Sequence, residues 1–232
     1  LSLLTGFHGE CRLIVTRTII IIQHLITGGV NIKALILFAN LCLPLILFLF
    51  YQSIRESEHR QRLILMGALL LFHFGYYDAI VWATDAIHYQ FLILFFVTSL
   101  YFLEKRTYML RAFSLLCALL ASMTFGNGLL IFPIAVFYLL LHKQWKTLAV
   151  WLLTGISFAM VYFRGFFSLE LEPAAFSFVD YFIYSCSFLG GAFQFFYKLY
   201  LPFTAGLLVW VLFIVLTVKK YYRKNFFIYA VI

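Results

Sequence analysis

Long apolar runs separated by short polar segments dominate this chain. A helix needs about 20 apolar residues to cross roughly 30 Å of hydrocarbon, where backbone N–H and C=O groups must bond to each other. The runs that meet or approach this length predict seven membrane spans, at Ile32–Tyr51, Leu63–Trp82, His88–Leu103, Ala112–Phe125, Leu129–Leu141, Thr147–Phe163 and Pro202–Val218.

Two further stretches fit a simple span poorly. Leu13–Ile26 is apolar but short, and segments of that length are more often interfacial or re-entrant than spanning. Phe176–Leu201 is rich in aromatic residues and is interrupted by glycines, a glutamine and a lysine, so we expect a bent or surface-lying helix pair. Within the first span, Pro44 predicts a kink.

The predicted fold class is therefore all-α, a polytopic transmembrane bundle of about seven spans with interfacial or re-entrant helices. We expect one membrane domain over residues 1–232. It would comprise an outer interfacial segment (1–31), the bundle (32–225) and the start of a further, truncated span (226–232). The apolar end of the chain and the missing initial Met suggest an internal piece of a longer protein.

Composition supports the membrane interpretation. Of the 232 residues, 65% are hydrophobic and only 11% are charged, and the mean hydropathy is +1.00. Soluble domains carry about 25% charged residues, so the composition argues against a soluble fold. The four cysteines form no CxxC pair, which favours apolar packing over a disulfide or a zinc site.

The basic residues indicate an orientation rather than a nucleic-acid surface, because they form short clusters between apolar runs. Cytoplasmic loops of membrane proteins carry the Lys/Arg excess. Twelve of the 17 basic residues lie in four segments predicted to share this inner side: Arg55, Arg60, Arg62, Lys105, Arg106, Arg111, Lys143, Lys146, Lys219, Lys220, Arg223 and Lys224. We expect a bacterial inner (plasma) membrane location.

Groups capable of acid–base chemistry gather on the predicted outer side. In a helix, Asp78 and Asp85 share a face because they are seven residues apart, and Asp85 and His88 are adjacent at a spacing of three. These groups could be catalytic and position a base, a divalent metal ion or a pyrophosphate-bound cation. In the structural alternative, Asp85 caps a helix within an aromatic interfacial belt.

A second outer cluster precedes the first span. His8, Glu10 and Arg12 are followed by Arg17 and His24, and Glu10, Arg17 and His24 recur every seven residues. Such a face could bind a lipid phosphate through Arg, with Glu10 as a further catalytic candidate. It could equally be a solvated face on a surface helix, with Glu10 and Arg17 merely paired.

The segment Gly126-Asn127-Gly128 is typical of a tight turn between antiparallel helices. Because both flanking helices are short, the turn could be sunk below the membrane surface, with Asn127 lining a cavity. The sequence contains no P-loop, GxSxG, HExxH or GxGxxG motif, so nucleotide-driven chemistry has no support.

Several motifs together resemble a group of bacterial polytopic membrane proteins similar to GT-C-type glycosyltransferases. They are HGECRLIVTR, then YDAIVW and HYQF, then FGNGLLIFP and FLGGAF. The resemblance implies a bundle with a lipid-facing groove, an acidic base in outer loops and a polyprenyl-phosphate-linked sugar as donor. His8, Glu10 and Arg12 would correspond to the His/Glu/Arg-rich stretch of that group.

The leading hypothesis is a glycosyltransferase-like membrane protein. An outer carboxylate would activate an acceptor hydroxyl in the cell envelope, while Arg12 or Arg17 would hold the lipid phosphate. The alternatives are a transporter or flippase for lipid-linked saccharides, which should place charge near the bilayer midplane, and a non-catalytic membrane subunit.

Overall fold

The computed structural model describes residues 13–56, 58–72, 80–105, 107–164, 177–190 and 200–218, and all regular structure there is helical. The chain divides into two compact units. The first unit contains residues 1–68 and 78–169, and the second contains residues 69–77 and 170–232.

In the first unit, the predicted span at Ile32–Tyr51 is confirmed as an apolar stretch of 22 residues, Ile32–Ser53, but it is broken. Helix α3 (Ile32–Asn40) and helix α4 (Cys42–Ser53) meet at Leu41. The break lies where Pro44 predicts it, because proline has no N–H to donate to the carbonyl of Asn40 four residues earlier.

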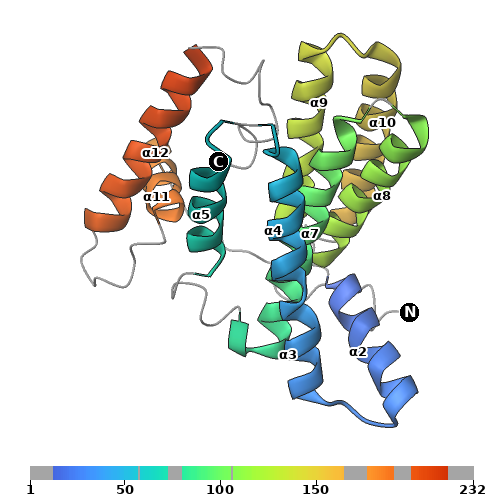
Figure 1. The fold of residues 1–232 in the computed structure, drawn as a ribbon. Helices are drawn as coiled ribbons and strands as arrows, with labels where there is room; N and C mark the ends of the chain where they lie inside the picture. The colour runs from blue at the N-terminus through green and yellow to red at the C-terminus, as the bar shows by residue number, and fades with distance from the viewer. Residues whose placement is uncertain are drawn as a thin grey trace. The chain divides into compact units, whose positions relative to one another are not determined.

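Helix α2 (Ile14–Thr27) precedes this pair, and its length matches the prediction of a short apolar helix. Gly28 ends α2 with a φ of 73°, a left-handed conformation that glycine adopts without strain. Asn31 then begins α3 by accepting a hydrogen bond from the N–H of Ala34 at 3.1 Å. The two helices form a hairpin whose turn lies at the lower end of this unit in Figure 1.

Helix α7 (Ala83–Leu103) contains the segment predicted as a span at His88–Leu103 but begins five residues earlier, and it is long and apolar enough to cross a membrane. It lies against α3, α4 and helix α8 (Tyr108–Thr124), and half of its apolar window is buried. Leu35 and Ala39 of α3 form a buried cluster with Ala86 and Ile87 of α7. Helix α7 is therefore the central element of the first unit.

The contact between α7 and α8 contains a reciprocal pair of serines. The hydroxyl of Ser99 donates to the carbonyl of Ser114 at 2.7 Å, and the hydroxyl of Ser114 donates to the carbonyl of Ser99 at 2.6 Å. Both residues are fully buried. Small polar residues of this kind let membrane helices approach closely and bond across their interface.

The predicted hairpin after α8 is confirmed, but its turn is a short 3-10 helix, η2 (Gly126–Leu130). Helix α9 (Ile131–Leu141) follows, and helix α10 (Trp145–Tyr162) matches the segment predicted as a span at Thr147–Phe163. Of the described helices, three stretches are long and apolar enough to cross a membrane: Ile32–Ser53, α7 and α10. The other four predicted spans stay predictions.

The predicted span at Leu63–Trp82 is described only in part. Helix α5 (Arg60–Leu71) covers its first half, and residues 73–79 lie outside the described part of the chain. Three connections that carry basic residues, 54–59, 104–107 and 142–144, lie at the same, upper end of the first unit in Figure 1. Which side of a membrane these segments face stays a prediction.

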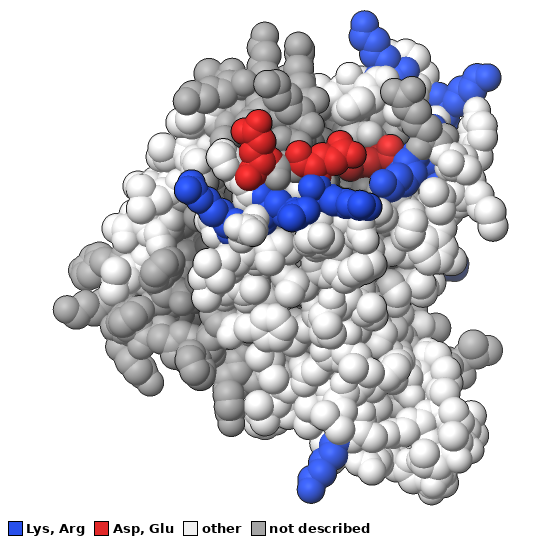
Figure 2. Space-filling model, viewed as in Figure 1, with Lys and Arg blue, Asp and Glu red and all other residues white. Residues whose placement is uncertain are grey.

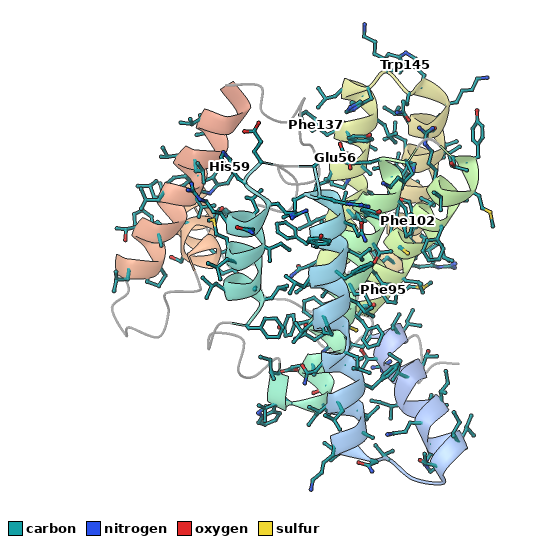
Figure 3. The ribbon with its side chains drawn as sticks, viewed as in Figure 1. Glu56, His59, Phe95, Phe102, Phe137 and Trp145 are labelled. Atoms are coloured by element: carbon teal, nitrogen blue, oxygen red, sulfur yellow. The ribbon has the colours of Figure 1, made fainter. Side chains whose placement is uncertain are left out.

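Charge follows the same division. Figure 2 shows a level of basic and acidic side chains where α4 ends, a broad uncharged surface over α3 and α4, and a basic side chain where α3 begins. Glu56 and Trp145, labelled in Figure 3, lie toward the upper end, whereas Phe95 lies lower, along α7. An uncharged zone between polar ends is the surface that a membrane-crossing unit requires.

The second unit contains helix α11 (Phe178–Leu189) and helix α12 (Tyr200–Val218). The backbones of the two helices lie so close together at Gly206 that a Cβ there would collide with the carbonyl of Cys186. The indole N–H of Trp210 also donates to Ser185 at 3.2 Å. Of the helix pair predicted within 176–201, the structure describes α11, which packs against α12. Residues 191–199 lie outside the described part of the chain.

Candidate functional site

The most concentrated polar group among the predicted site residues lies at the start of α7. Trp82 is extended and precedes the helix, so Asp85 falls in its first turn, where a carboxylate is favoured by the helix dipole. His88 follows one turn later, and its Nδ1 lies 4.0 Å from Oδ1 of Asp85. The predicted adjacency of Asp85 and His88 is confirmed.

The two side chains differ in exposure. The Asp85 side chain is 41% exposed, whereas that of His88 is only 11% exposed. The imidazole stacks on Phe125, at the junction of α8 and η2, with ring centroids 6.2 Å apart. The arrangement holds an imidazole behind an accessible carboxylate, which is suitable for accepting and relaying a proton.

Asn40 is a polar residue of this region that the sequence analysis did not single out. Its amide donates to the carbonyl of Ile80 at 2.9 Å, which ties the broken span to the segment before α7. Its Oδ1 is buried and has no hydrogen-bond partner among the described residues. The signal in the sequence was an amide side chain four residues before Pro44, inside an apolar run.

The predicted phosphate-binding face is described only for its later half. Arg17 and His24 both lie in α2, so a helix does carry them seven residues apart. Arg17 is half-buried near the start of α2, whereas His24 is exposed in its last turn. His8, Glu10 and Arg12 lie outside the described residues, and their roles stay predictions.

In the turn between α8 and α9, Gly128, the residue after Asn127, is the one that packs closely. Asn127 is exposed, and its predicted cavity-lining role stays a prediction. Gly128 is buried, and a Cβ at that position would collide with the backbone of Ala121 and Ser122. Close approach of the two backbones therefore requires a glycine at this position.

Metal binding needs several convergent ligands, usually three or more protein side chains. In the described part of the chain, no group of three or more His, Cys, Asp or Glu residues is placed to hold a metal ion. Asp85 and His88 alone supply two such groups. Asp78, the third member of the predicted cluster, lies outside the described residues.

Comparisons with protein-family models, curated proteins and solved structures found no match. The class of protein therefore rests on the fold itself. The described chain is all-helical, and three of its helical stretches are long and apolar enough to cross a membrane.

Proposed function

We propose that this chain is part of a GT-C-like membrane glycosyltransferase that moves a sugar from a polyprenyl-phosphate donor to a cell-envelope acceptor. The observation that carries the proposal is the accessible carboxylate of Asp85 beside the buried imidazole of His88, at the start of α7. The substrate class comes from the resemblance of the sequence motifs, and the chemistry comes from this pair of side chains.

The proposed topology has about seven spans, with the basic connections in the cytoplasm of a bacterial inner membrane. Helix α7 ends at one of these connections, 104–107, so its start lies at the opposite end of the first unit. In this topology Asp85 and His88 face the outer side, where lipid-linked sugars meet envelope acceptors.

In the proposed reaction, the carboxylate of Asp85 accepts the proton of an acceptor hydroxyl as that oxygen attacks the anomeric carbon. The bond between that carbon and the phosphate oxygen breaks, and the polyprenyl phosphate leaves with the electron pair. His88, 4.0 Å from the carboxylate, would stabilise its charge when protonated. Arg17, or Arg12 before it, would hold the departing phosphate.

The test is a sugar-transfer assay on the purified full-length protein in proteoliposomes, with polyprenyl-phosphate-linked sugars as donors. Asp85→Ala should lower kcat by about 10²- to 10⁴-fold, the usual range for losing a general base. Glu58→Ala is the matched control, because Glu58 is an exposed carboxylate in the connection before α5. Glu10→Ala and Asp78→Ala test the two other acidic candidates.

The outcomes separate the site from the function. Full activity in all three acidic variants would refute the assignment of the base, while transfer itself would remain established. Absence of transfer with every polyprenyl-linked donor would refute the enzyme proposal. The remaining interpretations would then be a transporter or flippase and a non-catalytic membrane subunit.

A second candidate, a transporter or flippase for lipid-linked saccharides, is favoured by one observation. The break between α3 and α4 leaves the buried Oδ1 of Asn40 without a described partner inside an apolar stretch. Discontinuous helices of this type line substrate sites in secondary transporters. Movement of a fluorescent lipid-linked saccharide between leaflets, lost in Asn40→Leu and retained in Asp85→Ala, would support this candidate over the enzyme.

A further inference from the structure

We propose that the tip of the α2–α3 hairpin is inserted into one leaflet of a lipid bilayer, with Lys33 at the level of the headgroups. This inference rests on the membrane character of the first unit and not on the proposed enzyme activity. The hairpin tip is defined here as residues 21–33.

Helix α2 is attached to the unit only near its start. Leu13 and Thr16 are buried, and Ile19 and Ile20 lie against the cluster formed by α3 and α7. Beyond that point the apolar side chains of α2 lose their cover. Leu25 and Ile26, in its last turn, are 76% and 77% exposed.

The other side of the hairpin continues the same surface. Val30 and Ile32 are exposed, and so are Leu37 and Phe38 further along α3. From residue 25 to residue 38, Lys33 is the single charged residue in the sequence. A continuous exposed surface of this apolar character marks a binding or membrane face rather than a water-facing one.

Several polar backbone groups of the turn between the helices are hydrogen-bonded within the protein. The side chain of Gln23 donates to the carbonyl of Asn31 at 3.0 Å and accepts from its N–H at 3.2 Å. The hydroxyl of Thr27 lies 2.7 Å from the carbonyl of Gly29, to which it can donate. Irregular backbone near the apolar region needs its hydrogen bonds made internally, and these bonds suit the turn to the boundary between headgroups and hydrocarbon.

Length limits the depth of insertion. The candidate span begins at Ile32, which places this residue near one membrane surface. Helix α2 has 14 residues and is therefore about 21 Å long, shorter than the roughly 30 Å of hydrocarbon. It returns from the surface without crossing the bilayer. Lys33, exposed at the start of α3, can extend its ammonium group to lipid phosphates.

The experiment measures what surrounds Leu25 in the full-length protein, reconstituted in phosphatidylcholine vesicles with phosphatidylglycerol. Leu25→Cys is labelled with an environment-sensitive fluorophore in a Cys11→Ser background, since Cys42, Cys117 and Cys186 are buried. Two matched positions calibrate the signal. Leu153→Cys, on the exposed side of α10, reports lipid, and Lys146→Cys, exposed at the start of α10, reports water.

We expect the Leu25 probe to be quenched by acyl-chain spin labels as strongly as the Leu153 probe. Its quenching by iodide should be at least about fivefold weaker than that of the Lys146 probe, because the apolar region holds little water. Iodide quenching equal to that at Lys146 would place the tip in water and overturn the proposal. Protection from both quenchers would mean that protein, such as a second copy, covers the tip, and would also overturn it.

A measurement on the natural sequence keeps the test independent of the cysteine variants. A lipid-soluble carbene reagent, activated in the same vesicles, should modify the peptide that contains residues 21–32 as strongly as the α10 peptide that contains the exposed Leu153. Modification below a tenth of that level would contradict insertion.

Discussion

The reciprocal serine pair of α7 and α8 allows a quantitative test of this fold. Each hydroxyl has one hydrogen, and each donates it to the carbonyl of the other serine, at 2.7 and 2.6 Å. The two hydroxyl oxygens are 3.2 Å apart, but both hydrogens are already used. The pair therefore consists of two independent hydrogen bonds rather than one shared bond.

The expected magnitude follows from this arithmetic. Hydrogen bonds between membrane helices contribute about 0.6 kcal/mol on average and up to about 1.7 kcal/mol. The bonds here are short and fully buried, so Ser99→Ala and Ser114→Ala should each lower the free energy of unfolding by about 1 kcal/mol. The double variant should be less stable than either single variant, with a loss of up to about 2 kcal/mol, because each serine donates its own hydrogen. Residues in contact couple, so the double loss departs from the exact sum by the interaction energy that a double-mutant cycle measures.

The assay is reversible unfolding of the purified protein in mixed micelles of dodecyl maltoside and dodecyl sulfate, which separates helices but leaves them helical. Ser122→Ala is the control, because the buried hydroxyl of Ser122 donates to the carbonyl of Ala118 in the same helix, at 2.9 Å. That bond survives in the separated helix, so the control should change stability little. A double variant no less stable than either single variant would refute the two-bond reasoning.

Three further predictions concern turns and helix ends. Gly128→Ala should lower the unfolding midpoint in the same micelle assay by far more than Asn127→Ala, since a Cβ at residue 128 meets the α8 backbone whereas Asn127 is exposed. Lys143 has a φ of 53°, a left-handed conformation that glycine adopts more easily than lysine. Lys143→Gly should therefore be as stable as the natural protein or more stable by up to about 1 kcal/mol, and a less stable glycine variant would contradict this. The backbone N–H and hydroxyl of Ser177 hydrogen-bond to Asp180 and lower the pKa of that carboxyl below 3.8. Because the pKa of Asp180 is lower in the folded protein, its hydrogen bonds stabilise the fold fully above pH 3.8, and this stabilisation is lost as the pH falls through the folded pKa. NMR titration of the Asp180 carboxyl should show the lowered pKa, and Ser177→Ala should raise it toward 3.8.

The sequence predicted the elements whose signal is local. Run length and hydropathy located α7 and α10, and Pro44 marked the break between α3 and α4, because the missing N–H acts on a carbonyl only four residues away. The start of α7 was placed five residues too late. Polar Asp85 resembles a loop residue in sequence, yet in the structure it occupies the first helical turn.

What could not be predicted depends on how separate helices approach each other. The contact of Ser99 with Ser114 requires the crossing geometry of α7 and α8, and the burial of Gly128 requires the path of η2. For the candidate site, helical spacing alone predicted that Asp85 and His88 would be adjacent. The stacking of His88 on Phe125 joins residues far apart in sequence, which no spacing rule contains.

The position of α7 also has a consequence for how the protein is made. During synthesis this helix leaves the ribosome before α8, while His88, Gln90 and Ser99 still lack the neighbours beside which they are buried or stacked. Such residues make the transfer of an isolated helix from the translocon into lipid less favourable. We therefore expect α7 to wait at the translocon until α8 emerges, so that the two helices enter the bilayer together.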